Sequence, residues 1–277
     1  NMGTPAVANW QTIVASSGWS LTGNSGIDSA TNFIGTLNTK PFIIRVNNVR
    51  SGYIDTITSN TSFGFRTLDS STTGTANTAI GFKSLSGNKT GENNTGLGWG
   101  ALQFNSSGSF NTASGVYGLY ANTTGSQNTA LGQLAMYSNT TGGQNNAVGS
   151  DAMRYNTTGS SNVGIGFTSL YFNTTGYSNI AVGTGALFNT GNRSNLVAIG
   201  DSALFNNGIG ATLAAHGIAN TAIGSKALFN NTTGYFNTAN GSNALFSNTT
   251  GFQNTASGTG SLRSNNTGIL NTSTGFN

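Results

Sequence analysis

Side chains that could carry out chemistry are scarce in this sequence. His216 is the only histidine and there is no cysteine, and a lone imidazole cannot assemble a zinc site. The only carboxylates are Asp28, Asp55, Asp69, Glu92, Asp151 and Asp201. In the repeat described below, stacked strands ~4.8 Å apart would hold Asp151 and Asp201 about 14 Å apart, beyond the ~5–9.5 Å of glycosidase pairs. We therefore predict that the protein is not an enzyme and has no catalytic, cofactor-binding or metal-binding residues.

Charge is equally sparse. Only 6% of the 277 residues are charged, against about 25% in typical globular domains. The 10 basic residues give a net charge of +4 but form no cluster, and a surface that follows phosphates needs clustered charge. No apolar run approaches the ~20 residues that span a bilayer. Nucleic-acid binding and membrane insertion of this segment are therefore not expected.

A repeat dominates the chain from Asn60 to Asn277. The unit Asn-Thr-Ala-Φ-Gly-x-x-Ala-Leu-x-x-Asn-x-Thr-Gly-x-x, with Φ usually apolar, recurs every 17 residues, and its residues are numbered here as positions 1 to 17. The step from Gly200 to Gly224 is 24 residues, seven more than the period, and we assign the expansion to 211–219. Thirteen units can be counted, the last of them cut short.

A short fixed period predicts an all-β fold. One repeat per coil gives a solenoid, and 17 residues are too few for the helix pairs of helical repeats. We expect a parallel β-roll of about 13 coils, with strands at positions 1–5 and 8–11. Gly at positions 5 and 15 and Asn at position 12 are expected at corners that need positive φ.

The two faces of the first strand lead to a prediction about assembly. If position 4 points inward with the Leu or Met of position 9, alternation turns position 3 outward. Position 3 is always Ala, Gly or Ser in the full units, and small residues let two chains approach closely. Association of several rolls would bury this row of small side chains; the alternative is a flat, solvent-facing row. The candidate interface between rolls is Ala113, Ala130, Ala147, Ala181 and Ala198.

Residues 1–59 do not fit the repeat and are assigned to a first region, with 60–277 as the repeat region. Phe42–Val46 reads as a strand, Asn47-Asn48 as a turn and Val49–Ile54 as a second strand. We expect a small β cap over the first coil, or alternatively a joint to an upstream shaft.

Aromatic residues and the expansion are the candidate binding features. Aromatic side chains recur at position 10, where they either pack over a corner or form a track that contacts sugars or proteins. Leu213–Ala219 either forms a protruding recognition loop or braces a neighbouring chain. The recurring Asn-x-Ser/Thr motifs fit turns and Asn ladders better than glycosylation. The candidate binding surface is Tyr177, Tyr235, Phe236, Phe252 and His216.

Two units carry a family resemblance. Asn77-Thr-Ala-Ile-Gly81 and Asn195-Leu-Val-Ala-Ile-Gly200 resemble the head repeats of YadA-like trimeric adhesins. The resemblance implies a left-handed parallel β-roll in a homotrimer. We therefore expect an intertwined or side-by-side homotrimer, with the five alanines above as its candidate trimer interface. The longer unit, with its Asn-Thr-Thr-Gly turn, is similar to repeats of bacterial and phage tail-fibre-like proteins, which implies an extracellular location.

The expected function is that of a structural and adhesive fibre protein. Three copies would present identical rows of side chains to a cell-surface glycan or protein receptor, and weak contacts would add by avidity. One alternative is binding to ice or another crystal, because paired threonines such as Thr123 and Thr124 recur in rows. A second alternative is a polysaccharide-degrading spike.

Overall fold

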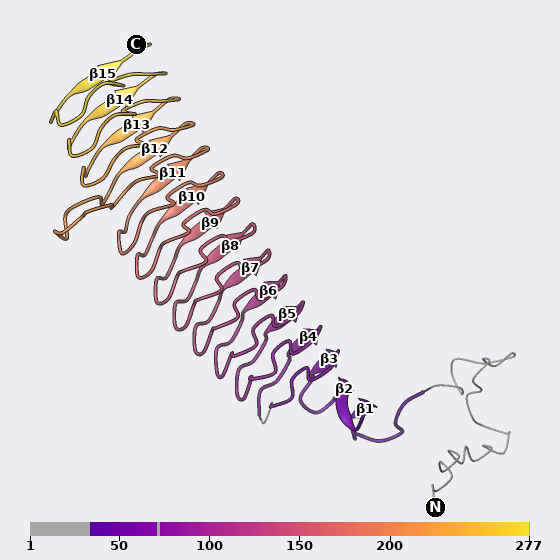
Figure 1. Ribbon diagram of the computed structural model, residues 1–277. Helices are drawn as coiled ribbons and strands as arrows, with labels where there is room; N and C mark the ends of the chain where they lie inside the picture. Colours follow the sequence, from indigo (N-terminus) through magenta and orange to yellow (C-terminus); the bar gives the residue numbers. More distant parts are fainter. Residues whose placement is uncertain (1–33, 71–72, 277) are drawn as a thin grey trace, which may run out of the picture. The chain divides into compact units, whose positions relative to one another are not determined.

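The computed structural model describes residues 34–70 and 73–276 (Figure 1). The chain divides into two compact units, Asn1–Lys40 and Pro41–Asn277. Every strand lies in the second unit, and the described residues contain no helix, and so none that could cross a membrane. The strands are β1 (Phe42–Val46), β2 (Val49–Ile54), β3 (Thr61–Phe63), β4 (Thr78–Ile80), β5 (Thr95–Leu97), β6 (Thr112–Ser114), β7 (Thr129–Leu131), β8 (Asn146–Val148), β9 (Val163–Ile165), β10 (Ile180–Val182), β11 (Val197–Ile199), β12 (Thr221–Ile223), β13 (Thr238–Asn240), β14 (Thr255–Ser257) and β15 (Thr272–Thr274).

The unit Pro41–Asn277 is a parallel β-solenoid. Strands β3 to β15 follow one another in a single sheet in sequence order, each parallel to the next, as Figure 1 shows. They mark about 12 turns with a period near 17 residues. The register holds across the expansion, because Ala198 pairs with Ala222 as Ala181 pairs with Ala198. The predicted all-β solenoid and its period are confirmed.

An antiparallel hairpin precedes the first turn. Strands β1 and β2 have the predicted bounds, and Asn47 and Asn48 have φ of 48° and 57°, as a tight hairpin turn requires. Strand β2 pairs antiparallel with β3. The hairpin therefore belongs to the unit of the solenoid, and the boundary predicted at 59/60 falls inside that unit; much of the predicted region 1–59 lies outside the described residues.

The predicted orientation of the short strands is wrong. In β4 to β14 the middle residue, at position 3, is buried and position 4 points outward. A Cβ placed on Gly164 would lie 3.0 Å from Cγ of Met153. Position 3 thus faces the long side chain at position 9 of the preceding unit. The interior is too narrow for two large side chains to meet there, so position 3 is restricted to small residues from the inside.

The second predicted strand, at positions 8–11, is also absent. Positions 7 and 9 have left-handed backbone conformations instead, and the Leu or Met at position 9 has φ between 46° and 53°. Each left-handed non-glycine residue costs roughly 1–2 kcal/mol. Position 9 is nevertheless inward, as predicted, and is fully buried from Leu68 to Leu245. Backbone hydrogen bonds to the next turn, such as Leu85 N to Ala101 O at 3.0 Å, stabilise this wall.

Glycine is required at positions 5 and 15 for two different physical reasons. Gly at position 5 has φ between 113° and 141° throughout, as predicted. Gly at position 15 of the regular turns and Asn at position 12 do not adopt positive φ, and Gly217, after the expansion, is the exception among the described position-15 glycines. A Cβ on Gly125 would lie 2.3 Å from the carbonyl oxygen of Gly142. Position 15 is therefore glycine because successive turns touch there.

Two columns of buried asparagines run along the solenoid. At position 12, Asn122 Nδ2 donates to Asn105 Oδ1 at 2.7 Å and to the Gly125 carbonyl at 2.9 Å. At position 1, Asn128 Nδ2 donates to Asn111 Oδ1 and to the Gly142 carbonyl. Because these amides are fully or almost fully buried, each bond replaces a lost contact with water. The predicted ladders are confirmed, and the Asn-x-Ser/Thr asparagines of position 12 from Asn88 to Asn248 are buried in the folded chain.

Candidate interaction surfaces

The outer face of the sheet carries a row of mainly apolar side chains at position 4, which Ser114 interrupts and which becomes polar from Asn240 on. Ile80 is 47% exposed and Ile223 is 40% exposed. Between β9 and β11 the row widens, because position 2 there is also aliphatic, as at Ile180. We call this the position-4 row; its large exposed members are Phe63, Ile80, Leu131, Val148, Ile165, Ile199 and Ile223.

The residues predicted to form a trimer interface lie on the other side of the same sheet. Their exposed fraction is 0% in the single chain, so they have no surface with which to contact a second copy. The physical reason is the reversed orientation of the strand, which turns position 3 into the solenoid's own core. The residues concerned are Ala113, Ala130, Ala147, Ala181 and Ala198.

The aromatic residues at position 10 form a stack. Neighbouring rings lie 4.8 to 5.5 Å apart with interplanar angles of 2° to 12° from Tyr171 to Phe246. The guanidinium of Arg263 lies over the last ring, at 5.5 Å. Burial raises the pKa of the Tyr171 hydroxyl. Since each ring face is covered by the next ring, only ring edges reach solvent, which favours the packing interpretation over a sugar track.

The candidate binding residues fall into separate groups. Tyr235 stacks on Phe252 at 4.7 Å and meets Phe236 edge-on at 5.5 Å. Tyr177 is 54% exposed but lies three units earlier, with Ser194 and Ile218 at the equivalent position in between. The structure thus brings together three of the predicted aromatic residues and leaves Tyr177 apart.

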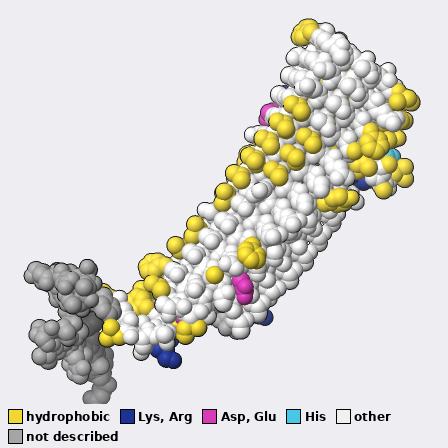
Figure 2. Space-filling view, turned by 180° about the vertical axis from the view of Figure 1, so that it is seen from behind, with side chains coloured by type: hydrophobic (Ala, Val, Ile, Leu, Met, Phe, Trp, Pro, Cys, Tyr) yellow, Lys and Arg dark blue, Asp and Glu magenta, His cyan; other side chains and the backbone are white. Residues whose placement is uncertain are grey.

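The expansion is anchored to its own chain. Asn207 Nδ2 donates to the Gly217 carbonyl, so the repeat pattern resumes at Gly217. The nine residues 208–216 therefore stand where a regular turn has two, and the expansion lies there rather than at the expected 211–219. Arg193, which is buried, donates to the carbonyls of Leu213 and Ala211 at 2.9 and 3.0 Å. Burial lowers the pKa of Arg193. Figure 1 shows the segment projecting beyond neighbouring turns, and Figure 2 shows apolar side chains gathered on that side.

His216 belongs to this anchored segment. Its Nδ1 accepts a hydrogen bond from the Leu213 backbone N–H at 3.4 Å, within the turn itself. The side chain is half-buried, whereas Leu213 is largely exposed. Exposed apolar side chains of the expansion, rather than the imidazole, are therefore what this projection offers to a partner.

The carboxylates in the described chain have structural partners where they are buried. Asp55 accepts hydrogen bonds from Thr58, Tyr53 and the Ile57 N–H, and these bonds, led by that of Thr58, lower its pKa. Asp151 forms an ion pair with Arg154 at 2.7 Å. Within residues 34–70 and 73–276, no three metal-ligating side chains cluster.

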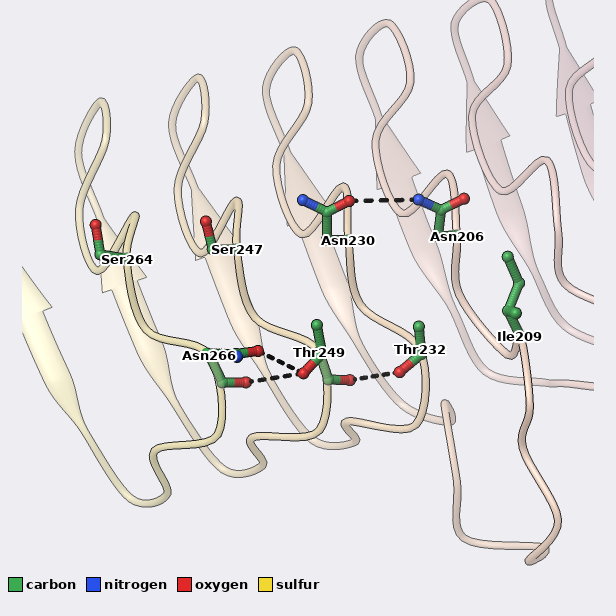
Figure 3. Close-up of a pocket in the computed structure, with 8 residues that line it drawn as sticks. All are labelled: Asn206, Ile209, Asn230, Thr232, Ser247, Thr249, Ser264 and Asn266. Atoms are coloured by element: carbon green, nitrogen blue, oxygen red, sulfur yellow. Dashed lines mark hydrogen bonds between the residues drawn. The ribbon is translucent and has the colours of Figure 1, made fainter.

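A groove that sequence reasoning missed runs along the last turns (Figure 3). It has a volume of about 580 Å³. One wall is the position-11 row of Asn206, Asn230, Ser247 and Ser264. The other wall is the position-13 row of Thr232, Thr249 and Asn266, and Ile209 of the expansion closes one end. The available signal was the small polar residues at position 11, where earlier units have Phe104, Tyr155 and Phe172.

Comparison with known proteins gives no match: no family model, no curated protein and no solved structure is similar to this chain.

Proposed function

We propose that the protein is a non-enzymatic, structural and adhesive fibre component that works outside the cell, on a cell-surface fibre or a tail fibre. The observation that carries the proposal is the repetition of identical side-chain rows along a solenoid of about 12 turns. Such an arrangement gives many weak contacts at fixed spacing, which add by avidity when the receptor is itself repetitive. The receptor class is a cell-surface glycan or protein.

We further propose that the fibre is a homotrimer joined through the position-4 row. From Leu131 to Ile223 the row is an unbroken line of aliphatic side chains, most of them exposed, and exposed apolar patches are typical of interaction surfaces. The row replaces the alanine column as the proposed contact. In this arrangement the β1–β2 hairpin acts as a cap on the first turn, because it pairs with the edge of β3.

The native mass of the full chain tests the assembly. We expect a trimer for the unaltered protein and a smaller species for Ile165→Glu, which places a charge in the middle of the position-4 row. Thr158→Glu, an exposed change at position 14, is the matched control and should keep the trimer. A monomeric unaltered protein would contradict the trimer.

Binding to whole cells tests the adhesive role. The trimeric protein should bind with an affinity that falls steeply in Ile165→Glu, because loss of multivalency removes avidity without touching the binding site. Equal binding by both proteins, or none by either, would contradict the proposal.

A second candidate function is binding to ice or another crystal surface. Thr61, Thr78, Thr95, Thr112 and Thr129 stand at position 2 of five successive strands on the flat sheet, at the ~4.8 Å strand spacing. The paired threonines near the corner are less suitable, because Thr123 Oγ1 donates to the Thr140 carbonyl. Thermal hysteresis and ice-recrystallisation assays test this function, and a null result in both assays would exclude ice binding.

A further inference from the structure

We propose that the groove between the position-11 and position-13 rows binds an extended, uncharged glycan chain that runs along the solenoid axis. The inference rests on the proposed adhesive function and names a ligand class and a site for it. The groove is open along its length, and none of the residues that line it is charged.

The position-11 row offers free hydrogen-bonding groups. Asn206 Nδ2 donates to Asn230 Oδ1 at 3.5 Å. Within the described part of the chain, the Asn230 Nδ2 group and the hydroxyls of Ser247 and Ser264 make no hydrogen bond. In Figure 3 these side chains stand in a line along one side of the groove. Amides and hydroxyls that can donate and accept are the groups that pair with sugar hydroxyls.

The position-13 row offers methyl groups. Thr232 Oγ1 donates to the Thr249 carbonyl at 3.0 Å, and Thr249 Oγ1 bonds to the Asn266 side chain at 2.5 Å. Because these hydroxyls are held by the next turn, the threonine methyl groups face the groove, as Figure 3 shows. A pyranose ring has a hydroxyl-rich edge and an apolar C–H face, so one polar wall and one methyl wall suit it.

The length of the site follows from the turns. The position-11 row spans four turns, from Asn206 to Ser264, and three spacings of ~4.8 Å give about 14 Å. An extended sugar chain has a similar advance per residue, so about three units would fit. Ile209 marks the end of the site, because the expansion blocks the groove there.

Other ligand classes fit less well. An extended peptide needs unpaired main-chain groups to form a β-ladder, but the backbone here is already paired, as in Thr232 N to Thr249 O at 2.9 Å. Nucleic acids and acidic sugars need cations to neutralise their charge. Only an uncharged, hydroxyl-rich chain matches both walls.

The fold itself supplies the variant that tests the site. Ser247→Phe would fill the groove with a side chain that position 11 already carries in Phe104 and Phe172, next to Tyr171 at position 10. Ser138→Phe makes the same change at the same position outside the groove and is the matched control. Both variants should keep the native mass and thermal midpoint of the unaltered protein.

The probe is an array of linear oligosaccharides of glucose, mannose, galactose and N-acetylglucosamine, with sialylated and sulfated chains alongside. We expect the unaltered protein to bind a neutral chain. Ser247→Phe should bind that chain at least about tenfold more weakly, which corresponds to a loss of at least ~1.4 kcal/mol. Ser138→Phe should bind it as tightly as the unaltered protein. Equal binding by Ser247→Phe, binding of acidic chains alone, or binding of no glycan overturns the inference. If the protein still binds whole cells in those cases, the adhesive function stands and only the groove assignment falls.

Discussion

Successive turns are held together in two different ways, one in the regular turns between Asn77 and Ser178 and the other in the irregular segment 189–219. In the regular turns, the buried amides at position 1, and those at position 12 from Asn105 on, are paired with the turn before them, as Asn139 is with Asn122. In the irregular segment, three column residues change together: Thr190 stands at position 12, Arg193 at position 15 and Leu196 at position 1. The comparison teaches that stability is distributed over many equivalent bonds in one region and concentrated on a few side chains in the other.

The substitutions of the irregular segment are connected through Arg193. Its side chain leaves the turn and hydrogen-bonds to carbonyls of the expansion, and a Cβ placed on Gly208 would lie 3.1 Å from its Cγ. The altered turn at 190–193 and the longer one at 208–216 are therefore one structural feature. The altered turn supplies the arginine that holds the expanded turn in place.

The largest difference between the two regions should appear with a buried charge. Ala147→Glu places a larger, ionisable side chain where the exposed fraction is 0%, and burying an unpaired carboxyl group costs several kcal/mol, a large part of a domain's stability. We expect loss of the β-sheet signal in circular dichroism. Thr212→Glu, in the exposed part of the expansion, should leave spectrum and thermal midpoint unchanged. A folded Ala147→Glu protein would contradict the inward orientation of position 3.

The second-largest difference between the two regions is expected when a leucine side chain is truncated to alanine. Leu170 is fully buried in the regular turns, and Leu170→Ala should lower the free energy of unfolding by about 2–5 kcal/mol. Leu213 is 60% exposed in the expansion, and Leu213→Ala should change it by less than about 0.5 kcal/mol. Chemical denaturation of both variants measures the difference, and similar midpoints would contradict the burial of position 9.

The asparagine ladder at position 1 can be tested by reciprocal substitutions, Asn to Leu in the regular turns and Leu to Asn in the irregular segment. Asn128 Oδ1 accepts from the Asn145 backbone N–H at 3.0 Å, so Asn128→Leu strands a buried donor, at about 1–3 kcal/mol per unsatisfied group. Leu196 already interrupts this column, and nothing in the described chain accepts from the Asn220 backbone N–H. Leu196→Asn should therefore stay within about 1 kcal/mol of the unaltered protein, because the new bonds offset the lost apolar burial. If Asn128→Leu and Leu196→Asn lowered the denaturant midpoint equally, the ladder would add no stability.

The period, the parallel sheet, the hairpin and the burial of position 9 could all be predicted because residue type and spacing determine them. Orientation of the strand could not be. A three-residue strand has too few alternating positions to reveal its buried face, and aliphatic residues at position 4 suggested the wrong one. The left-handed conformation of Leu85 and its equivalents also has no signal in residue type, since leucine rarely adopts it.

The candidate site was harder to predict for a related reason. The groove depends on what position 11 lacks, and small residues such as Ser247 attract no attention in a sequence rich in serine. Stacking of the position-10 rings depends on the exact superposition of turns. The grouping of Tyr235 with Phe252 followed directly from the period, because equivalent residues of successive units must be neighbours.

The smallest global effect is expected for Arg193→Met, and it should be confined to the expansion. Methionine keeps most of the side-chain volume beside Gly208 but cannot donate to the carbonyls of Ala211 and Leu213. Those carbonyls belong to a projecting segment and can bond to water instead, so the thermal midpoint should fall little. Local opening should rise, with about tenfold faster amide exchange at 208–216 for a loss near 1.4 kcal/mol, while exchange in β4 to β9 stays unchanged. Arg154→Met, which removes a guanidinium paired with Asp151 in the regular turns, is the control and should leave exchange in the expansion as it was. Unchanged amide exchange at 208–216 in Arg193→Met would mean that the expansion is held by its backbone turn alone. The hydrogen bonds of Arg193 would then add no stability to the expansion.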